Sequence, residues 1–248
     1  MTQDQLTVVL VHGAFAESAS WNGVIERLQA KSLQVVAAAN PLRSVAGDAA
    51  YVRNVIAGIG KPIVLVAHSY GGFVITEAAA GNDSVVGLVY VCGFAPDHGE
   101  SAFALAARFP GGSVGPDTAN AYPVSTGGND LAIKQEVFHK IFAADVPAPQ
   151  AALMGATQRP ATDVALTGPL PTDSPAWKTI PSWFVFGEKD LIIPAELHRF
   201  MAKRANAKGT REIAGASHAL SVSDPEAVVA SILEAVKTVS AVGAAASA

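Results

Sequence analysis

Short, continuous apolar segments alternate with longer amphipathic segments along most of the chain. Continuous apolar runs are typical of strands that are buried on both faces of a parallel sheet. The amphipathic segments repeat apolar residues every three or four positions, which predicts helices. Strands are predicted at 6–11, 34–39, 62–67, 85–92, 182–187 and 210–214, and helices at 21–32, 46–59, 71–80, 194–205 and 224–239. This alternation predicts an α/β fold with helices on both faces of a mainly parallel sheet of about six strands.

The alternation stops between about residues 95 and 178. This segment is rich in proline and glycine, and it contains two short helical patterns, at 101–109 and 130–142. We expect no strand in it. A long insertion of this kind within a regular α/β chain is usually functional. We therefore expect residues 1–248 to form a single domain, with a cap inserted at about 95–178.

Composition and charge exclude several classes of partner. Half of the 248 residues are hydrophobic, 15% are charged, and the net charge is −4. No basic surface is expected that would bind nucleic acid, and an acidic protein has no electrostatic attraction to anionic membranes. The sequence shows no signal peptide and no apolar run long enough to span a bilayer, so we expect a cytoplasmic protein.

Neither a disulfide nor a metal site is expected. The single cysteine, Cys92, lies in an apolar run, and free cysteines there are usually small buried side chains. The six histidines include no H-x-x-x-H pair and have no cysteine cluster near them.

The segment Ala67-His68-Ser69-Tyr70-Gly71 stands where a predicted strand ends and a predicted helix begins. A serine on such a sharp turn is held above the edge of the sheet, at the N-terminus of a helix. The pattern is that of the nucleophile elbow G-x-S-x-G, with Ala67 in place of the first glycine. A helix-capping serine is the simpler alternative, and the placement between strand and helix favours a nucleophile, Ser69.

The segment Val11-His12-Gly13-Ala14-Phe15 follows the first predicted strand. A loop at this place can direct a backbone N–H at the space above Ser69. Acyl transfer develops negative charge on the carbonyl oxygen, and two preorganised N–H donors stabilise that charge. We expect these donors, which form an oxyanion hole, to be the backbone amides of Ala14 and Tyr70.

Two late loops supply the remaining members of a catalytic triad. Asp190 follows the fifth predicted strand and His218 follows the last one, so the chain order is serine, aspartate, histidine. In this arrangement His218 takes the proton of Ser69, and Asp190 fixes the tautomer of the histidine. Glu188 is a rival for the acid, and we prefer Asp190 because it lies further past the strand end. Asp97 as the acid and His68 as the base are weaker rivals.

These motifs together resemble the α/β-hydrolase superfamily across nearly the whole chain. The similarity is carried by VHGAF at 11–15, AHSYGG at 67–72, FGEKD at 186–190 and GASHAL at 215–220. The chain looks like the compact branch that contains plant methylesterases of the salicylate-binding type and hydroxynitrile lyases, and most of all like bacterial relatives of that branch. The resemblance implies the strand order 2-1-3-4-5-6, an inserted cap, no cofactor, and the triad Ser69, Asp190 and His218.

The same resemblance favours an esterase over a lyase. Hydroxynitrile lyases of this branch typically carry Thr where this chain has Gly13, and Lys where it has Ala219. The expected activity is hydrolysis of a small hydrophobic or aromatic carboxylic ester, or a lactone, through an acyl-enzyme on Ser69. Carbon–carbon hydrolysis, perhydrolysis and a receptor-like binding role remain alternatives, because all use or retain the same triad.

The partner that we expect is a small-molecule ester, and a homodimer is left open. By analogy with the branch, aromatic and aliphatic side chains should line the substrate pocket. The expected lining residues are Phe15, Tyr122, Phe138, Phe142 and Leu220.

Overall fold

A computed structural model describes residues 6–125 and 127–245 of the chain. Its main sheet has six parallel strands in the order β2-β1-β3-β4-β8-β9. This order is the one that the family resemblance implies, so the predicted fold class is confirmed. The strands are β1 (Thr7–Val11), β2 (Gln34–Ala38), β3 (Ile63–His68), β4 (Val85–Val91), β8 (Ser182–Gly187) and β9 (Gly209–Ile213).

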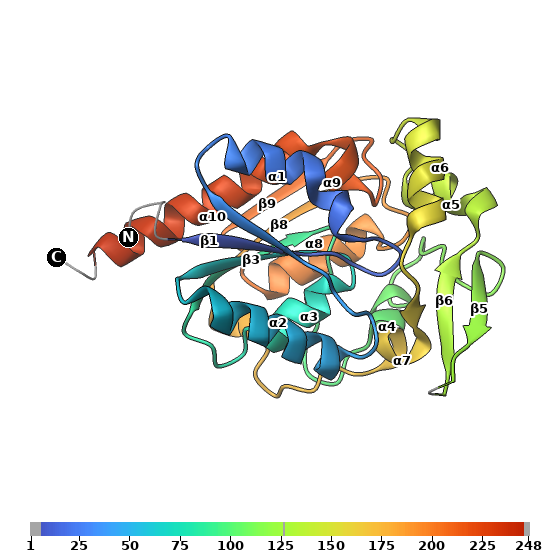
Figure 1. The fold of residues 1–248 in the computed structure, drawn as a ribbon, viewed down its shortest axis with the longest axis horizontal. Helices are drawn as coiled ribbons and strands as arrows, with labels where there is room; N and C mark the ends of the chain where they lie inside the picture. Colours follow the sequence, from blue (N-terminus) through green and yellow to red (C-terminus); the bar gives the residue numbers. More distant parts are fainter. Residues whose placement is uncertain (1–5, 126, 246–248) are drawn as a thin grey trace.

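Helices cover both faces of this sheet (Figure 1). On one face α1 contacts α10, which packs on β4 and β8, and on the other α2 packs on α3; α8 packs on β8. The long helices begin and end near the predicted positions. They are α1 (Asn22–Gln29), α2 (Val45–Ile59), α3 (Gly71–Ala78), α8 (Ala195–Arg204) and α10 (Pro225–Ala245), and the short α9 (Leu220–Ser223) and the 3₁₀ helix η2 (Ser18–Trp21) accompany them.

Burial of the strands explains why the sequence pattern was informative. Every residue of β1, β3 and β8 is buried, so these strands need apolar side chains on both faces. β2 lies at one edge of the sheet, and its first four residues are only partly buried or exposed. Cys92 is fully buried just after β4, as its apolar surroundings predicted. Within the described ranges, no helix is long and apolar enough to cross a membrane.

The segment between β4 and β8, here called the insert, lies beyond one end of the main sheet (Figure 1). It carries a small antiparallel sheet in the order β5-β6-β7, together with several short helices. Its elements are α4 (Ala102–Ala106), β5 (Ala119–Pro123), β6 (Asn129–Ile133), α5 (Gln135–Phe142), α6 (Ala148–Thr157), β7 (Ala161–Thr162), α7 (Asp163–Thr167) and the 3₁₀ helix η3 (Ala176–Lys178).

The expectation that the insert has no strand is therefore wrong. The helical pattern at 130–142 also began too early, because β6 occupies residues 129–133 and α5 starts at Gln135. β5 is an edge strand with four of its five residues exposed, so it has no buried face to produce an apolar alternation. Its last residue, Pro123, is tolerated because an edge strand leaves one row of N–H groups unpaired.

Candidate active site

Ser69 lies on a tight turn between β3 and α3, with its backbone in the left-handed region at φ 54°. A non-glycine residue adopts this conformation at a cost, and such strain is typical of functional positions. Backbone hydrogen bonds hold it there. The Ser69 N–H donates to the carbonyl oxygens of Val91 (3.3 Å) and Cys92 (3.2 Å), and its own carbonyl accepts from Gly72 and Phe94.

The loop after β1 approaches Ser69 closely at Gly13. A Cβ atom at Gly13 would lie 2.5 Å from the Ser69 Cβ and 3.2 Å from its Oγ, so a side chain at Gly13 would clash with the serine. The neighbouring amide of Ala14 and the amide of Tyr70, at the N-terminus of α3, donate no hydrogen bond to any described residue. Both N–H groups therefore remain available beside the Ser69 side chain, where a helix N-terminus also favours negative charge.

Three contacts fix this loop in place. The Asn40 side-chain amide donates to the carbonyl of His12 (2.9 Å), and the His12 Nδ1–H donates to the carbonyl of Gly13 (2.9 Å). The Phe15 N–H donates to the carbonyl of Arg159 in the insert (3.1 Å). Phe15 therefore uses its amide to join the loop to the insert, whereas the Ala14 amide donates to no described residue.

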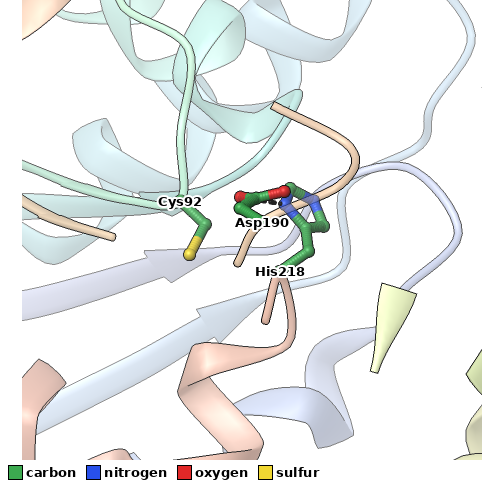
Figure 2. A group of neighbouring side chains, drawn as sticks. All are labelled: Cys92, Asp190 and His218. Carbon is green, nitrogen blue, oxygen red and sulfur yellow. Dashed lines mark hydrogen bonds and ion pairs between the residues drawn. The ribbon is translucent and has the colours of Figure 1, made fainter. Parts of the chain in front are cut away.

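The loops after β8 and β9 bring Asp190 and His218 together (Figure 2). The His218 Nδ1 lies 2.7 Å from the Asp190 Oδ2, and both side chains are buried. Gly187 makes the approach of the two loops possible, because a Cβ there would lie 2.3 Å from the Ala216 carbonyl oxygen. We refer to Asp190 and His218 as the buried pair. The other ring nitrogen of His218, Nε2, has no hydrogen-bond partner among the described residues.

Asp190 receives further hydrogen bonds. Its Oδ1 accepts from the backbone N–H groups of Ile192 (2.8 Å) and Ile193 (2.9 Å), and its Oδ2 lies 3.2 Å from the His198 Nε2. Burial opposes ionisation of this carboxyl group. The positive charge of a protonated His218 and the hydrogen bonds from both histidines outweigh burial, and they hold the pKa of Asp190 well below its usual range.

His68 precedes the serine and points away from it into the protein. Its Nε2 lies 2.9 Å from the carbonyl oxygen of His218, and its ring lies 4.6 Å from the His218 ring between centroids. Burial, together with repulsion from His218, lowers the pKa of His68 to about 3. A neutral, enclosed ring of this kind supports the position of His218 rather than accepting a proton at neutral pH.

The two rival acids lie elsewhere. Glu188 is exposed and accepts a hydrogen bond from the Gly215 N–H (3.0 Å). Asp97 pairs with Lys178 (2.6 Å) in the insert. Neither carboxylate contacts His218 among the described hydrogen bonds and ion pairs.

Cys92 lies against the buried pair (Figure 2). Its Sγ, a carboxylate oxygen of Asp190 and a ring nitrogen of His218 all lie within 4.8 Å of one another, a spacing that could hold a metal ion. Burial raises the pKa of the Cys92 thiol well above its usual range, and metals bind the thiolate. The buried pair is also already joined by a hydrogen bond. These three groups therefore do not fit a metal ion, and Cys92 is a neutral thiol that packs beside the buried pair.

A small cavity of about 40 Å³ adjoins Ser69. Phe15, one of the expected pocket residues, lines it. Tyr122 is 51% exposed on β5, whereas Phe138, Phe142 and Leu220 are buried, and none of these four residues lines the cavity at Ser69. Phe142 packs edge-on against the His218 ring, with 4.8 Å between ring centroids.

Several residues of the site were not found from the sequence. His198 and Asn40 reach the site only through the fold, and their positions along the chain carry no motif. The insert residues that line the cavity include Phe103, Val114 and Leu166; of these three only Phe103 falls in a predicted helical pattern, at 101–109, and none belongs to a sequence motif. A possible signal for His198 was its place on α8, directly after the Asp190 loop.

A model of the alpha/beta hydrolase family matches residues 8–231. The chain belongs to the α/β hydrolase family. The predicted resemblance is thus confirmed at the level of the family. Alpha/beta hydrolase nvfD of Aspergillus novofumigatus (strain IBT 16806) is 26% identical over 252 residues, which cover 92% of this chain and 95% of that protein.

Solved structures of several α/β hydrolases share this fold. Polyneuridine aldehyde esterase superposes with a TM-score of 0.77 at 19% identity, covering 93% of this chain and 98% of its own. A pyrethroid hydrolase from Sphingobium faniae JZ-2 superposes with a TM-score of 0.73 at 22% identity, covering 94% of this chain and 98% of its own. Tomato methylketone synthase I in complex with 2-tridecanone superposes with a TM-score of 0.77 at 17% identity, covering 93% of this chain and 97% of its own. At these identities the likeness establishes the fold alone.

The buried histidines predict how stability depends on pH. Burial lowers the pKa of His12 to about 4 and that of His68 to about 3, from an ordinary value of 6.5. Between pH 6.5 and 4 the unfolded chain therefore binds protons that the folded protein excludes. The free energy of unfolding should fall as the pH is lowered through this window, by roughly 1.4 kcal/mol per pH unit for each such histidine.

Urea unfolding between pH 7.5 and 4.5 measures this dependence. His12→Asn should reduce the slope by about 1.4 kcal/mol per pH unit, because it removes one of the excluded protons. Equal stability of the unmodified protein at pH 7.5 and 5 would contradict the assignment.

Proposed function

We propose that this α/β hydrolase cleaves carboxylic esters through an acyl-enzyme on Ser69. The observation that carries the proposal is the state of the His218 ring. Its Nδ1 is bound to a buried carboxylate, which places the ring proton on Nδ1 and leaves Nε2 as a free base. Ser69 stands on a strained turn that, like the loops of Asp190 and His218, follows the carboxyl end of a strand in the parallel sheet, where open α/β sheets bind ligands.

In the proposed reaction the Ser69 Oγ attacks the ester carbonyl carbon, and its proton passes to the His218 Nε2. The amides of Ala14 and Tyr70 donate to the oxygen that becomes negative. The alcohol then leaves with the proton from His218, and the acyl group stays on Ser69. A water molecule, deprotonated by His218, releases the carboxylic acid and restores the serine.

Among the described residues, the His218 Nε2 makes no hydrogen bond to Ser69. Hydrogen bonds between catalytic groups are often long until a substrate draws the groups together. Asp190 remains ionised because its charge is compensated by N–H donors, so it stabilises the imidazolium that forms during attack.

Gly13 favours hydrolysis over hydroxynitrile lyase chemistry. The lyases that the sequence resembles carry Thr at this position, and a Cβ there would lie 2.5 Å from the Ser69 Cβ. Gly13 therefore places no side chain against Ser69. Ala219, where those lyases carry Lys, is a buried alanine with no charge to stabilise cyanide.

Apolar side chains support an uncharged ester as the substrate. The cavity at Ser69 is lined by Phe15, Phe94, Phe103, Leu166 and other residues without charge. Residues of the insert contribute part of this lining. Proteins of similar fold include a named esterase and a named pyrethroid hydrolase, which is consistent with ester hydrolysis.

Hydrolysis of p-nitrophenyl acetate and butyrate by matched variants tests the proposal. Ser69→Ala should lower kcat by at least about 10³-fold, and Asp190→Asn by about 10²- to 10⁴-fold, because the nucleophile or the histidine tautomer is lost. Glu188→Gln is the control for an exposed acid close in the chain, and it should change kcat less than about twofold.

Circular dichroism establishes that each variant is folded. A mild Asp190→Asn together with a severe Glu188→Gln would reject the assigned acid. Full activity of Ser69→Ala would reject the nucleophile. Stoichiometric binding of esters by the unmodified protein without turnover would instead support the receptor-like alternative.

A further inference from the structure

A second cavity adjoins the one at Ser69. Its volume is about 650 Å³, and it lies between α4, the following loop, and the first two strands of the small sheet. The two cavities share four wall residues, Phe103, Ala106, Val114 and Ile192. Every residue that lines the larger cavity is apolar or a glycine. We call this larger cavity the apolar chamber.

The two volumes differ greatly in what they can hold. A cavity of about 40 Å³ has room for only a few non-hydrogen atoms, whereas ligand pockets commonly measure about 300–1,000 Å³. Several chamber residues are exposed to water, including Phe103 and Ala121. Exposed apolar surface of this extent is costly and usually marks a binding site.

We propose that the substrate is an uncharged ester with an extended apolar group that passes the four shared residues and lies in the apolar chamber. This inference rests on the proposed ester hydrolysis at Ser69. The ester carbonyl occupies the small cavity, and a hydrocarbon chain or bulky ring system fills the chamber. A charged or strongly hydrated group is excluded, because the lining offers it no hydrogen-bond partner.

A series of p-nitrophenyl esters from acetate to decanoate, kept below micellar concentrations, tests this substrate class. The value of kcat/KM should rise about two- to fourfold for each added methylene up to about eight carbons, since each methylene leaves water. Methyl and octyl esters of one acid show whether the apolar group enters from the alcohol side instead. A rise in either series supports the chamber.

Ala106→Phe places a larger side chain in the wall that the two cavities share, and it should lower the octanoate-to-acetate ratio of kcat/KM at least tenfold. Ala104→Phe is the matched control, because Ala104 is exposed on the same helix and lines neither cavity; it should retain the ratio. Hydrolysis of acetate with no dependence on chain length in either series would overturn the chamber and leave the proposed function standing.

Binding provides a readout that does not require turnover. Methyl decanoate should bind to Ser69→Ala protein in calorimetry. It should bind at least tenfold more weakly when Ala106→Phe is added, and unchanged when Ala104→Phe is added. If methyl decanoate does not bind to Ser69→Ala protein, the chamber is overturned, whether or not the unmodified protein hydrolyses esters. A failure of the unmodified protein to hydrolyse any ester rejects the proposed function separately.

A second inference concerns His198 on α8, which contacts the Asp190 carboxylate of the buried pair. Its Nε2 lies 3.2 Å from the Asp190 Oδ2, the oxygen that also accepts from His218. The ring is fully buried and is stacked on Phe186 with 4.8 Å between centroids. Burial lowers the pKa of His198, so the ring is neutral. A carboxylate only accepts, so the proton is on Nε2.

We infer that His198 is a positioning residue that weakens the hold of Asp190 on the His218 proton. Donation from His198 withdraws negative charge from the shared oxygen, so the carboxylate stabilises a protonated His218 less strongly. The role is distinct from that of the two backbone donors, which bind the other oxygen of Asp190.

Other groups that face the buried pair leave the pH profile interpretable. The pKa of His68 is about 3 and that of the Cys92 thiol is raised well above its usual range, so neither changes charge between pH 5 and 8. The charged groups beyond them are Asp145, which accepts from Ser217 in the His218 loop, and Glu212 on β9.

His198→Met removes the donor and keeps much of the volume, whereas His198→Gln keeps an N–H near the same place. For His198→Met the acid limb of kcat/KM against pH should move up by about half a unit or more. His198→Gln should stay within about 0.2 units of the unmodified protein. Rates are followed at the isosbestic wavelength of nitrophenol and nitrophenolate.

A loss of packing alone would lower kcat/KM equally at every pH. An unmoved acid limb in His198→Met would therefore overturn the inference, as would equal shifts in both variants. If His198→Met does not fold, His198→Asn takes its place, because its shorter amide removes the donor from Asp190 and keeps a polar group. Its acid limb should move in the same direction, and an unmoved limb would again reject the role.

Discussion

The buried charge of Asp190 is the constraint on which the arrangement of the site depends. A carboxylate taken out of water without compensation would be neutral or strongly destabilising. Here each carboxylate oxygen meets two N–H groups, from the backbone on one side and from two histidine rings on the other. Removing the carboxylate leaves the His218 Nδ1–H buried and unpaired. The position of the His218 ring is therefore set by the Asp190 carboxylate.

The insert lines part of the cavity at Ser69 and also contacts two of the loops that carry the site. The carbonyl of Arg159 accepts from Phe15 in the loop after β1, and Asp145 accepts from Ser217 in the loop before His218. Phe142 packs on the edge of the His218 ring. A shift of the insert would consequently move both the free Ala14 amide and the His218 ring.

Much of this architecture could be predicted from the sequence, since buried parallel strands must be apolar at nearly every position. The strands, the elbow at Ser69 and the loops that carry Asp190 and His218 follow from segments with strong local signals, whereas the strand order came from the resemblance to a known family. The strands of the insert could not be predicted, because β5 is exposed and its partner β6 is short. His198 and the apolar chamber were missed for a different reason: both exist only through contacts between segments distant in the chain. The roles assigned to Ser69, His218, Asp190 and the two amides remain a proposal.

The most direct measurement is intact-protein mass spectrometry after treatment with a fluorophosphonate, which reacts with a serine only when a neighbouring base activates it. We expect one adduct per chain, located on the peptide that contains Ser69, with no adduct on folded Ser69→Ala protein. Absence of an adduct on the folded unmodified protein, or an adduct that persists in Ser69→Ala, would contradict an activated nucleophile at this position.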